Sequence, residues 1–349
     1  MAYISFQPSD YFNTQLYTGT GSTNAQTGVG FQPDWVFIQN RGGTYANVVF
    51  DAVRGTTKLL EPQGSGAEAT VSDTLTSFDS DGFTLGADSS NYCNRSSSPN
   101  TYVAWNWKAG NAQGSSNTDG SINTTYTSVN TTAGFSISKY TGNGVSNATV
   151  GHGLGSNVDF LLIKDLGNTS NWIVGHKDTF TTGEIYLNQT NALSAAFGPF
   201  NKTAPTTSVF GLGSDGTTNG NGQTYIAYCF AEKTGYSKFG KYTGNGQANG
   251  TFVYTGFKPA MIIFKITSST GDWRIFDNKR DTFNVADAIL YPSDASNAEG
   301  TEISADFLSN GFKIRSSSSS YNTSGGTYIY MAFAEEPLVS SNNIPATAR

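Results

Sequence analysis

Tyr140-Thr-Gly-Asn-Gly144 and Thr224-Tyr225-Ile-Ala-Tyr-Cys-Phe-Ala-Glu232 mark the start and the end of a segment that the chain carries three times. The first copy opens on Tyr17-Thr-Gly-Thr-Gly21 and closes on Thr101-Tyr102-Val-Ala-Trp-Asn-Trp107. The third opens on Tyr242-Thr-Gly-Asn-Gly246 and closes on Thr327-Tyr328-Ile-Tyr-Met-Ala-Phe-Ala-Glu335. The opening tyrosines lie 123 and 102 residues apart, and the closing tyrosines 123 and 103. Two independent markers with matching spacing indicate a triplication.

The order of sequence features inside each copy predicts β-structure. A Gly-rich bend precedes a short apolar run, at residues 35–38, 160–163 and 261–264. Such runs between turn signals are typical of buried strands. Copies 1 and 3 then show a strand, a Ser-Asp/Asn-Gly turn and a strand, at residues 78–85 and 307–314. With six to eight strands per copy and no helix, we expect an all-β chain of three tandem antiparallel β-sandwiches, of the lectin-like or jelly-roll type.

The spacing of the copies predicts the domain boundaries. Repeat 1 is expected at residues 17–108, repeat 2 at 136–233 and repeat 3 at 238–336. Residues 109–135, rich in Gly, Ser, Asn and Thr, are expected to form a linker, so that repeats 2 and 3 pack closely and repeat 1 is more independent. The remaining pieces are an N-terminal docking segment, 1–16, and a polar C-terminal tail, 337–349.

Composition and charge exclude several classes of protein. Only 13% of the 349 residues are charged and 13% are aromatic. The net charge is −6, and no Lys- or Arg-rich run provides a footprint for nucleic acid. The N-terminus lacks the pattern of a signal peptide, and no stretch has the length of a membrane span. We therefore expect synthesis in a cytoplasm, no nucleic-acid partner and no membrane insertion.

Candidate catalytic residues are few. The two histidines, His152 and His176, both lie in copy 2 and without a nucleophile elbow, so we expect neither to be catalytic. The run 211–216 matches a dinucleotide fingerprint but leads into another Gly/Asn loop, which favours a turn. The two cysteines, Cys93 and Cys229, occupy different positions of the repeat, so a disulfide is not expected.

Charged pairs recur in two copies. Asp51 with Arg54, and Asp277 with Arg280, are three residues apart and are interpreted as strand-end ion pairs, with acid/base chemistry as the alternative. The acidic turn around Asp79 is too sparse in ligands for a calcium site. We therefore predict no enzyme activity, no cofactor and no bound metal.

The loops that precede the closing strands differ most between copies. Tyr, Ser, Asn and Gly at loop tips are the composition of adaptable recognition surfaces. A solvated loop without a ligand is the alternative. The predicted ligand contacts are Tyr92, Asn94, Asn221, Tyr321 and Asn322, and the predicted virion-docking residues are Phe6, Tyr11 and Phe12.

The shared motifs also resemble a known group of proteins. The Tyr-Thr-Gly-Asn-Gly opening, the Gly-Phe-x-Pro bend, the Ser-Asp-Gly-Phe hairpin, the closing Tyr-Val-Ala-Trp-Asn-Trp-Lys, the junction at 117–137 and the start at 6–14 are similar to repeats in virion proteins of tailed phages, especially marine ones. The resemblance covers residues 6 to about 336 and implies a tail-fibre-like protein of the virion surface. It implies no catalytic residues. Copy 2 departs from the pattern at the bend, at His176 and in its hairpin.

Three hypotheses follow for the function. The first is a non-enzymatic attachment protein on the virion exterior, assembled in the host cytoplasm, that contacts other tail or capsid proteins and a host surface glycan or protein. The second is a capsid or tail decoration protein, whose copies would match threefold geometry. The third, a polysaccharide depolymerase, lacks a carboxylate pair shared among the copies. A homo-oligomer, including a trimer, stays open.

Overall fold

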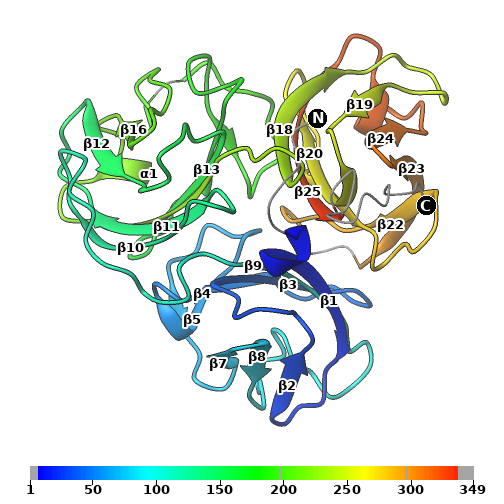
Figure 1. Ribbon diagram of the computed structural model, residues 1–349, viewed down its shortest axis with the longest axis horizontal. Helices are drawn as coiled ribbons and strands as arrows, with labels where there is room; N and C mark the ends of the chain where they lie inside the picture. Colours follow the sequence, from blue (N-terminus) through cyan, green and yellow to red (C-terminus); the bar gives the residue numbers. More distant parts are fainter. Residues whose placement is uncertain (1–6, 197, 296–297, 337–349) are drawn as a thin grey trace.

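The computed structural model describes residues 7–196, 198–295 and 298–336. The chain folds as three antiparallel β-sandwiches arranged as a triangle, which confirms the predicted all-β class (Figure 1). We call them unit 1 (residues 7–108), unit 2 (109–233) and unit 3 (234–336). Each unit has an inner sheet that faces the centre of the triangle and a smaller or equal outer sheet at its rim.

Unit 1 begins with a short 3-10 helix, η1 (Pro8–Asp10), that leads into the inner sheet. The inner sheet has the order β1 (Phe12–Thr18), β9 (Thr101–Trp107), β3 (Trp35–Asn40), β4 (Val48–Asp51), β5 (Gly55–Leu60) and β6 (Ala69–Thr70). The outer sheet has the order β2 (Asn24–Thr27), β8 (Gly82–Leu85) and β7 (Leu75–Asp79).

Units 2 and 3 repeat this plan with different outer sheets. The inner sheet of unit 2 has the order β10 (Thr124–Asn130), β11 (Phe135–Thr141), β17 (Thr224–Phe230), β13 (Phe160–Asp165), β14 (Ile173–His176) and β15 (Ile185–Tyr186), and its outer sheet pairs β12 (Ala148–Gly151) with β16 (Val209–Leu212). The inner sheet of unit 3 has the order β18 (Ser237–Thr243), β25 (Thr327–Glu336), β20 (Lys258–Ile266) and β21 (Arg274–Asp277). Its outer sheet has the order β19 (Phe252–Tyr254), β24 (Gly311–Ile314), β23 (Gly300–Leu308) and β22 (Ala286–Ile289).

The two sequence markers of each copy pair with each other. The opening and closing tyrosines are cross-strand partners, as Tyr17 with Tyr102, Tyr140 with Tyr225 and Tyr242 with Tyr328. Their rings stack with centroids 5.1, 5.2 and 4.7 Å apart. Each opening hydroxyl donates to a backbone carbonyl of the loop that precedes the closing strand, at 2.7, 2.7 and 2.9 Å. The motif therefore joins the inner sheet to its own variable loop, with every buried hydroxyl satisfied.

Each inner sheet is buried on both faces, which explains why its central strands are continuously apolar. In β13, Leu161 and Ile163 point into the sandwich of unit 2, whereas Phe160 and Leu162 point to the centre of the triangle. Side chains of a strand alternate between faces, so a strand covered on both sides needs apolar residues at every position. All six residues of β13 are buried.

The inner sheets of the three units share one central core. Trp107, Phe230 and Phe333 occupy the same position of the three closing strands, and their rings contact one another pairwise with centroid distances of 5.6 to 6.3 Å. All three are about 1% exposed and belong to a single apolar cluster. Unit 1 is therefore packed against its neighbours as the other units are, and the expectation that it is more independent is wrong.

Equivalent hydrogen bonds close the triangle. Each unit donates a side-chain N–H to a backbone carbonyl of the next: Trp172 Nε1 to Glu61 (3.0 Å), Trp273 Nε1 to Tyr186 (2.9 Å) and Asn47 Nδ2 to Tyr291 (3.0 Å). A second set joins backbone groups: Glu68 N to the Leu166 carbonyl (3.0 Å), Leu193 N to Thr267 (2.9 Å) and Glu299 N to Arg41 (2.9 Å). Within each set the donor-to-acceptor direction is the same at all three interfaces, and the two sets run in opposite rotational senses. The units therefore form a closed ring with pseudo-threefold symmetry, within one chain.

Three expectations about segments need correction. Residues 109–135 are not wholly a linker, because β10 forms the edge of the unit 2 inner sheet through its pairing with β11. Residues 12–16 belong to β1 rather than to a separate docking segment. Two single-turn helices, α1 (Gly216–Asn219) and α2 (Ser319–Asn322), occur where no helix was predicted. Residues 337–349, the predicted tail, lie outside the described residues.

Candidate binding surface

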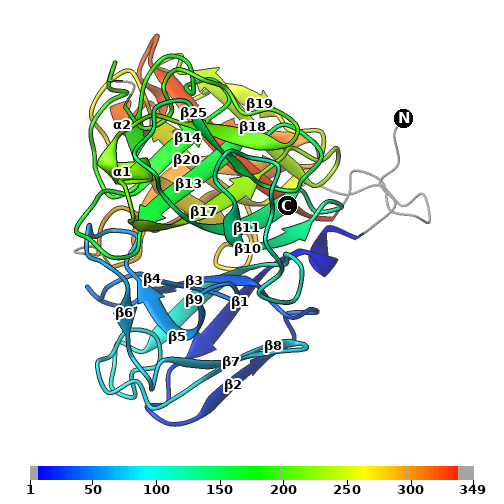
Figure 2. The same ribbon diagram turned by 90° about the vertical axis from the view of Figure 1, so that its left-hand side faces the viewer.

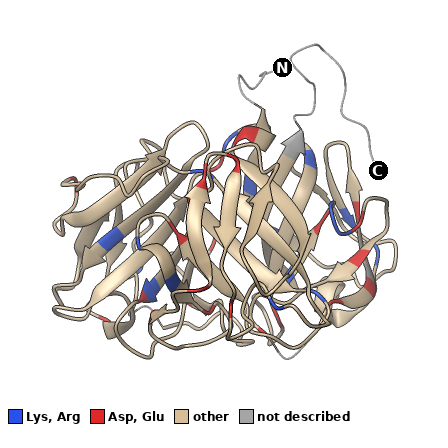
Figure 3. Cartoon of the chain, turned by 90° about the horizontal axis from the view of Figure 1, so that it is seen from below, with Lys and Arg blue, Asp and Glu red and all other residues tan. Residues whose placement is uncertain are grey.

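The strand directions place all three variable loops at one end of the ring. The closing strands β9, β17 and β25 start at this end, next to the turns that follow the opening tyrosines. We call this end the loop face; it comprises residues 19–22, 88–100, 142–147, 213–223, 244–249 and 315–326, with the shorter connections between them. The start of β1 and the end of β25 lie at the opposite end (Figures 2 and 3). The loop face thus points away from both described chain ends.

The variable loops share one internal support, a buried asparagine. Asn94, Asn219 and Asn322 are each 0% exposed. In unit 2, Asn219 Nδ2 donates to the carbonyls of Gly213 and Val145, at 2.7 and 2.9 Å, and its Oδ1 accepts from Asn143 N at 2.9 Å. The other two asparagines bind the same turns of their units in the same way. Each asparagine ties the loop to the opening Tyr-Thr-Gly turn.

This support corrects three predicted ligand contacts. Asn94 and Asn322 face the interior of the loop and hold it together. Tyr321 is 1% exposed, and its hydroxyl donates to the Glu302 carboxylate. Burial raises the pKa of the Tyr321 phenol, with a further rise from the Glu302 bond. Of the predicted contacts, only Tyr92, half-buried, and Asn221, exposed, are open to solvent.

The predicted docking residues also lie mostly inside. The Phe12 ring is 1% exposed and stacks on Phe333 at 5.2 Å in the central core, so it stabilises the ring of units rather than facing a virion partner. Tyr11 is half-buried, edge-on to Tyr236 at 6.4 Å. Phe6 lies outside the described residues.

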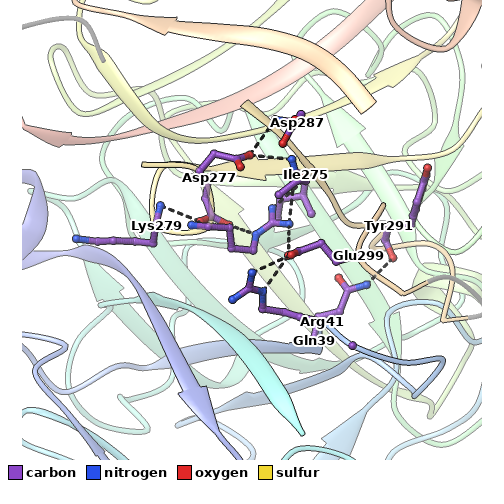
Figure 4. Close-up of polar contacts among 12 residues, drawn as sticks. Gln39, Arg41, Ile275, Asp277, Lys279, Asp287, Tyr291 and Glu299 are labelled. Carbon is purple, nitrogen blue, oxygen red and sulfur yellow. Dashed lines mark hydrogen bonds and ion pairs between the residues drawn. The ribbon is translucent and has the colours of Figure 1, made fainter. Parts of the chain in front are cut away.

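The two Asp-x-x-Arg pairs are buried ion pairs at the unit interfaces. Asp277 accepts from Arg280 Nε at 2.6 Å (Figure 4). It also accepts from Trp105 Nε1 of unit 1 at 3.1 Å. Arg280 also contacts Glu299 at 3.1 Å, and Glu299 binds Arg41 of unit 1 through both carboxylate oxygens, at 2.8 and 2.9 Å. The network joins unit 3 to unit 1. This arrangement agrees with the ion-pair interpretation.

The equivalent pair in unit 1 makes the equivalent contact. Asp51 binds Arg54 and accepts from the Tyr228 hydroxyl of unit 2 at 2.7 Å. Burial opposes ionisation of Arg54, but the nearby carboxylates, Asp51 first, raise its pKa overall. Tyr228 and Trp105 occupy the same position of the closing strand, as do Asp51 and Asp277 of the inner sheet. The aromatic N–H or O–H therefore caps a neighbour's ion pair in two of the three interfaces.

The third interface has lost both partners. His176 takes the place of the aspartate, and Met331 that of the aromatic donor. Burial lowers the pKa of His176 to about 4, against the opposing effect of Asp178, so the imidazole is neutral near pH 7. His152 is also buried, and its Nε2 lies 3.2 Å from the carbonyl of Thr206. His176 is 0% exposed as well, and its Nδ1 accepts from Asp178 N at 3.1 Å, so both histidines make hydrogen bonds inside unit 2.

The other candidate motifs have structural contacts within the chain or are buried. The run 211–216 leads into α1, whose second residue, Thr217, donates its backbone N–H to Oδ1 of the N-cap residue Asp215 at 2.7 Å. Cys93 and Cys229 are buried free thiols, and burial raises the pKa of both. Among the described residues, His, Cys, Asp and Glu form no group of three or more suited to a metal ion. In the same part of the chain, no helix has the length and apolarity of a membrane span.

A polar depression on the loop face has no counterpart in the sequence prediction. It lies where unit 2 meets unit 3 and has a volume of about 310 Å³. Its lining is entirely polar: Asn188, Gln189, Thr190, Asn191, Asp272, Ser293 and Asp294. The residues come from three separate connections, after β15, before β21 and after β22, so no local motif could have revealed it.

Contacts across the interface fix the walls of this depression. Lys265 Nζ of unit 3 donates to the Thr190 carbonyl of unit 2 at 3.0 Å, and Gly271 N to the same carbonyl at 2.8 Å. The amides of Asn188 and Gln189 both donate to Asn171 Oδ1, at 3.0 and 2.9 Å. Burial lowers the pKa of Lys265 to about 8. This set of amides, hydroxyls and carboxylates can hydrogen-bond a ligand with many hydroxyl groups.

Comparison with known proteins finds one family. The sequence pattern of a domain of unknown function, DUF7483, matches residues 7–337, nearly the whole chain. No curated protein and no solved structure matches the chain.

Proposed function

The chain belongs to the DUF7483 family, and we propose that it is a non-enzymatic virion surface protein of the tail-fibre or host-attachment type. Its loop face binds a glycan of the host cell surface, and its opposite end contacts other virion proteins. The resemblance of its repeats to virion proteins of tailed phages supports the virion setting.

One observation carries the proposed glycan contact. The depression between units 2 and 3 is lined only by residues with amide, hydroxyl or carboxylate side chains, and these belong to connections on the loop face. Sugars present hydroxyls in pairs, which planar amide and carboxylate groups can each bind through two hydrogen bonds. Small-molecule sites that also rely on burial have mostly apolar walls. A lining made of polar residues favours a weakly bound, hydrated glycan.

Weak binding is compatible with attachment. Many copies on one particle convert each later contact into an intramolecular event, so millimolar sites can hold a particle. A rigid site also limits the entropy lost on binding. The closed ring of units supplies that rigidity, because the walls of the depression belong to two units that share a core.

The experiment is binding of the purified, labelled chain to a panel of marine bacterial cells and to isolated capsids and tails of tailed phages. We expect binding to cells. Asn191→Trp places a large side chain in the depression and should weaken binding to cells, whereas Ser22→Trp, also exposed on the loop face, should leave it unchanged. Binding to capsids alone, or cell binding unaffected by Asn191→Trp, would refute the proposed attachment site.

A second candidate function has its own supporting observation. The ring has pseudo-threefold symmetry, with equivalent contacts at its interfaces. A decoration protein that sits on a threefold or quasi-threefold position of a capsid would use such a shape without forming an oligomer. Imaging of labelled particles separates the two: label over the capsid faces supports decoration, and label at the tail supports attachment.

A further inference from the structure

Unit 3 exposes two aromatic rings on the outward face of its outer sheet. Phe252 and Tyr254 are two positions apart on the edge strand β19, so both side chains point away from the sandwich, while Val253 between them is buried in its core. The two rings are 44% and 59% exposed. Large exposed apolar side chains in one place indicate an interaction site more often than isolated ones do.

The outward face of the outer sheet differs between the three units in its side chains and in its exposure. Register through β8 and β24 places Phe252 and Tyr254 where unit 1 has Ala25 and Thr27, both exposed. In unit 2 the preceding chain pairs with the edge of the equivalent strand β12, where Ile122 N donates to the Thr149 carbonyl at 2.9 Å, and the Asn117 side chain lies over Gly151 on the outward face. The face thus carries small exposed side chains in unit 1, is covered in unit 2, and carries exposed aromatic side chains in unit 3.

The fold itself does not require these rings. The Phe252 ring lies across Gly311 of the neighbouring strand, where it could serve to cover a glycine. Unit 1 has Gly82 at the equivalent position of the same hairpin, and there Ala25 and Thr27 supply no ring. The hairpin therefore forms without an aromatic cover, and a structural role does not explain why unit 3 has two rings.

The surroundings of the rings indicate the chemistry of the partner. Lys313 is paired with Phe252 across the sheet and with Asp306 on its other side, so all three lie on the outward face. Arg315, exposed, binds Asp306 at 3.1 Å. Two rings beside hydrogen-bonding charged groups form a small mixed surface, less apolar than the core of a protein interface. The C–H face of a sugar ring can stack on the electron-rich face of an aromatic ring while its hydroxyls bind the charged groups.

We propose that Phe252 and Tyr254, with Asp306, Lys313 and Arg315, form a glycan-binding platform on the rim of unit 3. Alternate residues of a strand are about 6.6–6.8 Å apart, so the rings stack on one extended saccharide chain that runs along β19. The platform is separate from the depression on the loop face, and a particle can use both contacts on one polysaccharide.

The test is an array of purified bacterial capsular and lipopolysaccharide glycans, with a second array of random peptides. The double variant Phe252→Ala/Tyr254→Thr gives unit 3 the residues of unit 1, so it should fold and melt like the wild type. We expect it to bind the recognised glycans at least about tenfold more weakly, a loss of about 1.4 kcal/mol. Phe283→Ala removes another ring of unit 3, 79% exposed, and should bind like the wild type.

A gain of binding provides the complementary measurement. Ala25→Phe/Thr27→Tyr builds the same pair of rings on the open face of unit 1, and we expect it to strengthen binding to long polysaccharides through a second contact. Glycan binding that is equal in the wild type and in the Phe252→Ala/Tyr254→Thr variant would overturn the platform, as would binding by the wild type to peptides alone. Asn191→Trp changes only the depression on the loop face. When it is added to the wild type and to the Phe252→Ala/Tyr254→Thr variant, the ratio of their glycan affinities should stay the same, so each site can be disproved without the other.

Discussion

Phe230→Ala tests how strongly the three units depend on one another. The Phe230 ring lies in the central core, 1% exposed, with its centroid 4.5 Å from Phe135 of its own unit. It also contacts Trp107 of unit 1 at 6.3 Å and Phe333 of unit 3 at 5.9 Å. Its removal therefore opens a cavity where all three units meet.

The expected loss of unfolding free energy is about 3–5 kcal/mol, the usual cost of replacing a buried Phe by Ala. The upper half of this range applies, because the surrounding rings come from three rigid sheets that cannot collapse into the cavity independently. Phe210→Ala is the matched control: Phe210 is 0% exposed but belongs to the sandwich core of unit 2 alone.

Denaturant unfolding followed by hydrogen exchange distinguishes the two variants. We expect Phe230→Ala to speed exchange in β9, β17 and β25 together. Phe210→Ala should act first on β12 and β16, with a smaller effect on the other units. If Phe230→Ala accelerates exchange in unit 2 alone, the units do not share a cooperative core and the reasoning is wrong.

Three further predictions concern polar groups. His176 has a pKa of about 4 in the folded chain against an ordinary 6.5, so the unfolded chain binds more protons between these values; stability should fall by about 3 kcal/mol from pH 6.5 to pH 4 relative to His176→Asn, and parallel pH curves would contradict this. Asp277→Asn leaves the Arg280 charge buried without its main partner and should cost about 3–5 kcal/mol in thermal or denaturant unfolding, whereas a loss below about 1 kcal/mol would show that the pair is solvated. Asn219→Ala should cost about 1–3 kcal/mol and raise hydrogen exchange in residues 213–223 selectively; equal protection of that loop in both proteins would contradict its role.

The sequence predicts the fold of each unit well because that fold depends on short sequence motifs. The turn glycines, the apolar runs and the paired tyrosines recur in each copy, and the structure joins each pair of tyrosines in one register. The assembly was missed because it depends on contacts between distant residues. Trp172 and Glu61, for example, are joined across a unit boundary. The four-residue apolar runs did indicate this assembly. A strand that is apolar at every position is buried on both faces, so its sheet needs a second packing partner besides the outer sheet of its own unit.

The candidate site was predicted less well, for a physical reason. Tyr and Asn in a polar loop favour exposure by composition, yet Asn94, Asn219 and Asn322 are the residues that satisfy the buried backbone groups of the loop turns. An asparagine eight, six and six residues before the closing tyrosine is visible in all three copies and could have indicated a structural role. The aromatic pair of unit 3 shows the opposite pattern. Its two positions are aromatic in one copy alone, which indicates a role other than support of the fold.

Native-state hydrogen exchange of the unmodified chain tests the closed ring most directly. If the three inner sheets share one core, the slowest amides of β9, β17 and β25 open only on global unfolding and give the same free energy, shifted equally by added denaturant. Three different free energies, with unit 1 opening on its own well below the other two, would contradict the closed ring.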